Sequence, residues 1–109
     1  MQKEKRRFPT GQLICSRRVN LTIQKDSTFA AFVTLSLRKH KECDWGDCCS
    51  EDAALNDAAL NNGTRIFSVY NYKNEEVGDG KIWIITEADR VATTVLLSLI
   101  HISEPTRPY

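Results

Sequence analysis

The densest run of β-branched and aromatic residues lies at positions 81–96, and the predicted fold is centred on it. Over residues 81–87, apolar side chains occupy both alternating sets of positions, as expected for a strand covered on both faces. Residues 88–90 interrupt the run, and a second β-favouring run follows over residues 91–96. The pattern predicts a hairpin with a tight turn. The charged side chains of this turn are Glu87, Asp89 and Arg90.

Helical spacing of apolar positions predicts a helix over residues 28–41, with Ser27 as its N-cap. A second helix, rich in Ala and Leu, is predicted from a cap at Ser50 to a stop at Gly63. Both helices have charged residues that suit their dipoles.

Two further strands are predicted, at residues 12–15 and 65–72, and the segment 19–26 reads as a helical turn or a loop. The polar residues 73–80 suit a hairpin turn. We therefore expect one α+β domain over residues 8–96, with a small antiparallel sheet of three or four strands and two helices packed on one face.

The two ends of the chain are set apart from this domain. Residues 1–7 hold four basic side chains and one Glu, and we expect a disordered, solvated terminus. Back-translated, residues 97–107 match read-through of a transposase sequencing adapter, so we interpret residues 97–109 as an adapter-derived tail on a truncated reading frame. His101 is therefore not a catalytic candidate.

Charge and hydropathy limit the function classes. A net charge of +1 over 109 residues implies no strong general attraction to nucleic acid or acidic membranes. No run approaches the roughly 18 apolar residues that span a bilayer, and the basic N-terminus has no apolar core of a secretory signal. We expect a cytoplasmic protein with no membrane association and with reduced cysteines.

His40, Cys43, Cys48 and Cys49 form an H-x2-C-x4-C-C pattern that suggests a zinc site. Adjacent cysteines rarely both reach one tetrahedral ion, and paired C-x2-C knuckles are absent. Unpaired cysteines are the simpler interpretation, so we assign no metal and no cofactor.

A carboxylate-rich turn surrounds Trp45 and could hold Mg²⁺ or Ca²⁺. Its spacing does not match the calcium-loop pattern, and helix capping accounts for two of its four acids. These acids are Asp44, Asp47, Glu51 and Asp52.

The turn with Glu87, Asp89 and Arg90 has two interpretations of equal weight. Loops on a rigid sheet commonly carry function. Alternatively, Asp89 closes its own turn and Arg90 pairs with Glu87 or Asp44. The six-residue separation of Lys81 and Glu87 does not suit the E-x-K pairing of metal-dependent nucleases.

Four motifs carry a resemblance: F-P-x-G-Q at residues 8–12, H-x3-D-W-G-D at residues 40–47, N-x3-L at residues 56–60, and W-I-I-T-E-x-D-R-x-x-T-T at residues 83–94. With these motifs the chain resembles, over residues 8–96, a small protein family of gut bacteria, plasmids and phages. The family has Gly where this chain has Cys43, which weakens the zinc interpretation.

Members of that family carry the names "plasmid-related protein" or "type I restriction endonuclease subunit M". The resemblance implies a role in mobile DNA without a defined biochemical activity. The second name does not fit this chain, which lacks the nucleotide-binding sheet, glycine-rich cofactor loop and N-P-P-Y-like tetrapeptide of a methyltransferase.

Our leading hypothesis is a non-enzymatic accessory protein of mobile DNA that binds a protein or nucleic-acid partner. It places the DWGD and EADR turns close together, with Arg90 paired to an Asp and Trp45 at the base. The candidate binding residues are His40, Asp44, Trp45, Asp47, Glu87, Asp89 and Arg90.

Two alternatives remain open. The first is a small metal-dependent hydrolase or nuclease that uses His40, Asp44, Glu87 and Asp89. The second is direct DNA binding with the sheet as platform, through Arg6, Arg7, Arg17 and Arg18.

Overall fold

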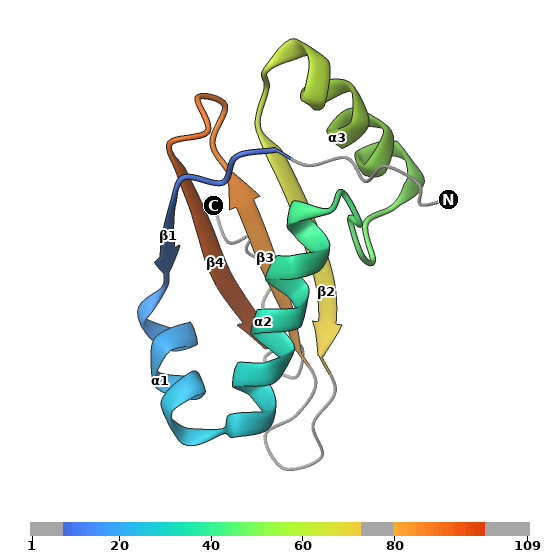
Figure 1. The fold of residues 1–109 in the computed structure, drawn as a ribbon. Helices are drawn as coiled ribbons and strands as arrows, with labels where there is room; N and C mark the ends of the chain where they lie inside the picture. Colours follow the sequence, from blue (N-terminus) through green and yellow to red (C-terminus); the bar gives the residue numbers. More distant parts are fainter. Residues whose placement is uncertain (1–7, 73–79, 100–109) are drawn as a thin grey trace, which may run out of the picture.

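A four-stranded sheet with strand order β1-β4-β3-β2 forms the centre of the molecule (Figure 1). The structure is a computed structural model and describes residues 8–72 and 80–99. In chain order the elements are β1 (Gln12–Cys15), α1 (Arg17–Lys25), α2 (Ser27–Lys41), α3 (Ser50–Asn62), β2 (Ile66–Tyr72), β3 (Gly80–Thr86) and β4 (Ala92–Leu99). The α+β class predicted from the sequence is confirmed.

Strand β3 is central, as its doubly apolar pattern predicts. It pairs antiparallel with β2 on one side and with β4 on the other, so that Ile84 lies between Ser68 and Val95. The side chains of Ile82 and Ile84 are fully buried. This strand therefore holds the two halves of the sheet together.

The sheet is mixed, whereas a purely antiparallel sheet was expected. Strand β1 runs parallel to β4, with Leu13 opposite Thr93, and the N–H of Gln12 donates to Val91 O over 2.8 Å. A parallel pair requires a long crossover connection, which here contains all three helices and two strands. The alternation of side chains is the same in both strand directions, so the sequence pattern could not distinguish them.

Helix α1 replaces the helical turn or loop expected over residues 19–26. The Ser16 hydroxyl accepts from the N–H of Val19 at its start, and the Val19 side chain is fully buried. Asp26 ends α1 and also caps α2, because its Oδ1 accepts from the N–H groups of Thr28 and Phe29. Burial of Val19 supports a helix whose β-branched residues and Asn20 give it weak intrinsic propensity.

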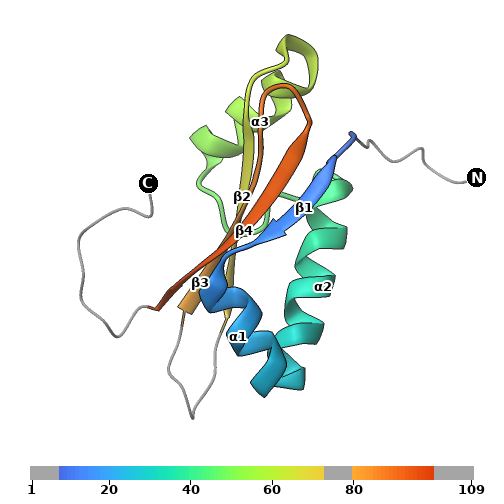
Figure 2. The ribbon, with the colours of Figure 1, turned by 90° about the vertical axis from the view of Figure 1, so that its left-hand side faces the viewer.

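Helices α1 and α2 cover one face of the sheet, and α3 lies at the edge formed by β2 (Figure 2). The expectation that both predicted helices share a face is therefore wrong for α3. The buried Asn56 amide donates to Phe67 O over 2.7 Å and accepts from Phe67 N–H over 3.1 Å. The side chain thus satisfies the edge of β2 as a neighbouring strand would, which the apolar pattern of α3 does not reveal.

The main core lies between the sheet and the α1–α2 layer. Phe29 of α2 contacts Tyr72 of β2 edge to face, with ring centroids 5.1 Å apart. On the opposite face of the sheet, Phe67 stacks on Trp83 with centroids 5.7 Å apart. The buried residues of the main core are Val19, Phe29, Val33, Tyr70, Tyr72, Ile82, Ile84 and Val95.

Some expectations fall at the limits of the described residues. Residues 73–79 of the predicted hairpin turn, and the expectations for residues 1–7 and 100–109, lie outside them. Within them, β4 extends to Leu99, beyond the end at residue 96 predicted for the domain, and Leu97 pairs with Ile82. The alternation of this segment fits a strand regardless of its origin.

The DWGD loop extends the protection of β2 beyond Asn56. Val69 N–H donates to Trp45 O, and Asp47 N–H donates to Val69 O, with a bridge between Gly46 and Val69. Gly46 has φ +71°, and a Cβ there would lie 2.3 Å from Val69 O. Only glycine allows this close approach to the strand.

We expect Gly46→Ala to lower the free energy of unfolding by roughly 2–4 kcal/mol, because left-handed strain adds to overpacking. Gly63→Ala is the matched control, since Gly63 has φ +73° but a Cβ added there would meet no atom within 4 Å. It should cost only about 1 kcal/mol. Urea unfolding of both variants measures the difference, and equal losses would contradict the close-approach explanation.

Candidate functional site

His40 lies at the centre of the region that the sequence singled out, but it is fully buried. Its Nδ1 is 2.6 Å from Ser68 Oγ, and its Nε2 is 2.9 Å from Thr86 Oγ1. The ring therefore connects α2 to β2 and β3. This is the arrangement of a hydrogen-bonded core histidine.

The neighbouring hydroxyls fix the tautomer of His40. Thr93 donates its single hydroxyl hydrogen to Thr10 O over 2.7 Å, so Thr86 must donate to Thr93 over 2.7 Å. Thr86 Oγ1 must then accept from His40 Nε2–H, which leaves Nδ1 to accept from Ser68. We call these residues the His40 chain: Thr10, His40, Ser68, Thr86 and Thr93.

Burial lowers the pKa of His40 from 6.5 to about 4, so the ring is neutral at neutral pH. Both ring nitrogens are engaged within the protein, and the side chain has no solvent exposure. Proton exchange with a substrate needs a group within hydrogen-bond reach of that substrate. In this arrangement His40 supports the fold.

Trp45 fills the space beside this chain, as its size predicts. It is 7% exposed, and its Nε1 donates to Asp57 Oδ1 over 3.0 Å. Its ring centroid lies 6.1 Å from those of both Phe8 and His40. A second buried cluster forms here with Ala59 of α3.

The two acids of the DWGD loop bind backbone N–H groups. Asp44 Oδ1 accepts from Gly46 N–H over 3.1 Å, and Asp47 Oδ2 accepts from Asn71 N–H over 2.9 Å. The Tyr70 hydroxyl donates to Asp44 O, and burial raises the pKa of Tyr70, so the hydroxyl stays protonated. These contacts hold the loop on β2.

Arg90 does not pair with Asp44, contrary to our expectation. Its guanidinium donates to Ala59 O over 3.0 Å and to Thr64 O over 2.8 Å, at the C-terminal end of α3. A cation at this end complements the helix dipole, and it adds a second donor to Ala59 O, which also accepts from Gly63 N–H over 2.9 Å. It also donates to the turn carbonyls of Glu87 and Ala88.

The EADR turn has the hairpin geometry expected from the sequence. Arg90 N–H donates to Glu87 O over 2.9 Å, and Arg90 has φ +62°. Asp89 Oδ1 accepts from Val91 N–H over 3.1 Å, so Asp89 closes its own turn. The Glu87 side chain is exposed.

The predicted site residues are only partly brought together. The guanidinium carbon of Arg90 lies 5.8 Å from the Phe8 ring centroid, and Phe8 lies 5.2 Å from His40. Phe8 thus connects the EADR turn to the DWGD loop, and the sequence reasoning assigned it no role. Its only signal was its place in the F-P-x-G-Q motif.

The zinc pattern does not assemble into a ligand set. Within residues 8–72 and 80–99, no three His, Cys, Asp or Glu side chains are grouped to hold a metal ion. Both nitrogens of His40 are engaged, and Cys48 Sγ donates to Phe67 O over 3.5 Å. Burial raises the pKa of the Cys48 thiol, which disfavours the thiolate that a metal requires.

Cys43 has φ +68° directly after the end of α2. The left-handed conformation at this helix position favours glycine. Cys43 therefore adopts this conformation at a cost that a glycine would not have.

The sequence reasoning missed a separation of charge between two parts of the chain. Residues 8–41 contain six Lys or Arg and one acid, Asp26, whereas residues 42–62 contain six acids and no Lys or Arg. The first segment includes the α1–α2 layer, and the second includes the DWGD loop and α3. The cations are Arg17, Arg18, Lys25, Arg38, Lys39 and Lys41.

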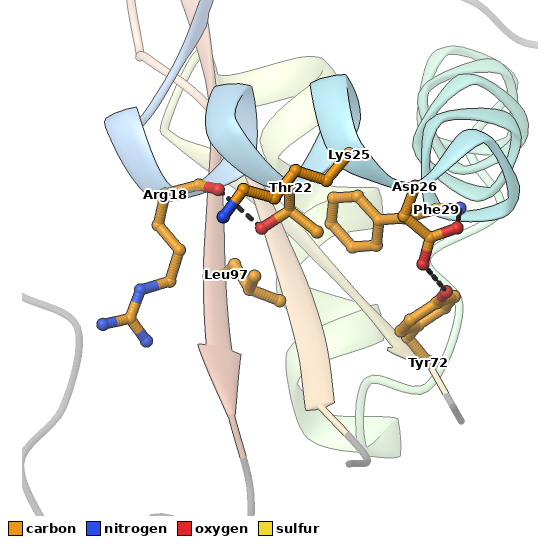
Figure 3. A pocket seen from close by; sticks show the side chains of 7 residues that line it. All are labelled: Arg18, Thr22, Lys25, Asp26, Phe29, Tyr72 and Leu97. Carbon is orange, nitrogen blue, oxygen red and sulfur yellow. Dashed lines mark hydrogen bonds between the residues drawn. The ribbon is translucent and has the colours of Figure 1, made fainter. Parts of the chain in front are cut away.

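The sequence reasoning also missed a cavity of about 270 Å³ between α1 and the sheet (Figure 3). Arg18, Thr22 and Lys25 line it at a spacing of four and three residues, which places them on one face of α1. This spacing becomes informative only once residues 17–25 are known to be helical.

None of the helices in the described part of the chain is both long and apolar enough to cross a membrane. Searches of protein-family models, curated proteins and solved structures give no match to this chain.

The buried His40 predicts a stability that depends on pH. Between pH 6.5 and about 4, the unfolded chain binds a proton at His40 that the folded chain excludes, so stability falls as pH falls. The expected loss is about 3 kcal/mol. Urea unfolding from pH 7 to pH 4 tests this, and His40→Gln should have a flatter profile. Parallel profiles for both proteins would contradict the prediction.

A double-mutant cycle separates the contacts of Asp44 and Arg90. Because they bind different backbone groups, Asp44→Ala and Arg90→Ala should be additive in the free energy of unfolding within about 0.5 kcal/mol. Trp45→Phe with Asp57→Ala is the positive control, with an expected coupling of about 1 kcal/mol from their hydrogen bond. If the coupling energy between Asp44 and Arg90 is as large as in this control, the two side chains form an ion pair and the prediction is wrong.

Proposed function

We propose that this chain is a non-enzymatic protein that binds nucleic acid through the exposed cations of α1 and α2. The observation that carries the proposal is the separation of charge along the chain. The net charge of +1 conceals a basic helical layer and an acidic segment that balance each other.

The position of the basic helices supports this proposal. Both of its helices lie on the same side of the sheet (Figure 2). Basic side chains on such a face attract the phosphate backbone irrespective of sequence, and the acidic α3 disfavours binding in other orientations. We call the exposed cations of this layer the basic helical surface: Arg17, Arg18, Lys25, Arg38 and Lys41.

The internal contacts of the predicted site support binding over catalysis. His40 is enclosed, and the carboxylates of Asp44 and Asp89 are held by backbone N–H groups of their own turns. The hydrolase alternative needs these groups at a substrate. A cytoplasmic accessory protein of mobile DNA, as the resemblance implies, would use nucleic acid as its partner through its helices and not through the sheet.

We expect Arg17→Gln and Arg38→Gln each to weaken binding of a 20-base-pair duplex. For each phosphate interaction that a variant removes, the slope of log affinity against log salt should become less negative by about 0.9. Fluorescence anisotropy between 50 and 200 mM salt measures this slope. With a 20-nucleotide single strand, the change in slope should be about 0.7 for each phosphate interaction removed.

Lys81→Gln is the matched control because it removes the same charge from the other sheet face. Lys81 alternates with the core residue Ile82, so it points away from α1 and α2. It should leave the slope unchanged. The proposal would be overturned if Lys81→Gln changed the slope as much as Arg17→Gln or Arg38→Gln. It would also be overturned if the folded chain bound no nucleic acid but retained a protein from lysate.

A further inference from the structure

The cavity beneath α1 lies between the α1–α2 layer and the sheet and is partly open to solvent (Figure 3). Arg18, Thr22 and Lys25 form its α1 wall, Phe29 comes from α2, and Tyr72 and Leu97 come from β2 and β4. Asp26, between the two helices, completes the lining. The volume of about 270 Å³ is slightly below the roughly 300–1,000 Å³ of typical ligand pockets, so it suits a small ligand.

The inner walls of the cavity are apolar. Phe29 is fully buried and packs edge to face against Tyr72, whose ring is also 4.9 Å from that of Phe32. Leu97 contributes a half-buried aliphatic side chain from β4. These aromatic and aliphatic surfaces favour the apolar part of a ligand.

Two of the polar lining groups are engaged with the protein. The Thr22 hydroxyl donates to Arg18 O over 2.8 Å, and the Tyr72 hydroxyl donates to Asp26 Oδ2 over 3.2 Å. Asp26 Oδ1 accepts from two N–H groups at the start of α2, so its negative charge is balanced by that helix terminus.

The charged groups that remain are Arg18 and Lys25. Both side chains are exposed, and within the described residues neither makes an ion pair. They lie seven residues apart, two turns along α1, on the side that lines the cavity. The site therefore combines an apolar interior with two cations at its rim.

We propose that this cavity binds a small amphipathic anion, which has an apolar chain or ring and a single anionic headgroup. The apolar part enters the space between α1 and the sheet, on the side of Phe29 and Tyr72, and the headgroup binds Arg18 and Lys25. This inference rests on the cavity and does not depend on nucleic-acid binding, although Arg18 and Lys25 belong to both surfaces.

The probe for this site is sodium octanoate, with 1-octanol as its uncharged counterpart. We expect octanoate to shift the backbone amide NMR signals of α1 and Phe29 and to bind at least tenfold more tightly than 1-octanol. Between pentanoate and heptanoate, affinity should rise about fourfold per added methylene, because each enters the apolar interior.

Three variants locate the ligand. The double variant Arg18→Gln/Lys25→Gln should lower octanoate affinity to that of 1-octanol and leave 1-octanol binding unchanged. Thr22→Leu should fill the cavity and weaken both ligands. Arg38→Gln/Lys41→Gln removes two cations at the far end of α2 and should change neither.

Three results would each overturn the proposal. They are equal affinities for octanoate and 1-octanol, equal losses of octanoate affinity in both double variants, and no binding of octanoate. Vesicles that contain phosphatidylglycerol separate a lipid surface from a free anion. Binding to these vesicles without binding of monomeric octanoate would also overturn it. If Thr22→Leu fails to fold, the double variants still decide, because they change exposed side chains only.

Discussion

The hydrogen-bond chain through His40 is the interaction on which most of this structure depends. One imidazole joins α2 to β2 and β3, and Thr86 and Thr93 extend the connection through β4 to Thr10 before β1. Donation by Thr93 to Thr10 O sets the direction of the hydrogen bonds from Thr93 to His40, so this chain is complete only when these elements are packed together. Buried networks of this kind are costly when a partner is missing, and they therefore specify one packing of the core.

A second constraint is the protection of β2. An exposed strand edge presents unpaired N–H and C=O groups, and here two different devices satisfy them. Asn56 binds both backbone groups of Phe67, and the DWGD loop binds those of Val69. The acids and glycine that suggested a binding turn in the sequence are used largely to hold this loop in place.

The elements with strong periodicity could be predicted from the sequence, whereas their relative placement could not. The hairpin around residues 87–91 and the helix over residues 28–41 follow directly from apolar spacing. The parallel pairing of β1 and the position of α3 at a strand edge have no signature in that spacing. For the candidate site, the burial of His40 agrees with its place on the apolar face of the helix, and the burial of Trp45 agrees with its size. The contacts of Arg90 could not be predicted, because it binds carbonyl groups that every residue has.

Asp26 gives the α1–α2 layer its cooperativity. It terminates one helix, starts the next and accepts a hydrogen bond from Tyr72 on the sheet, so three elements meet at one carboxylate. The two helices cannot fray independently at this junction, because the residue that ends one also starts the other. Opening of the last turn of α1 therefore disturbs the first turn of α2, and we expect these two turns to exchange their amide hydrogens together.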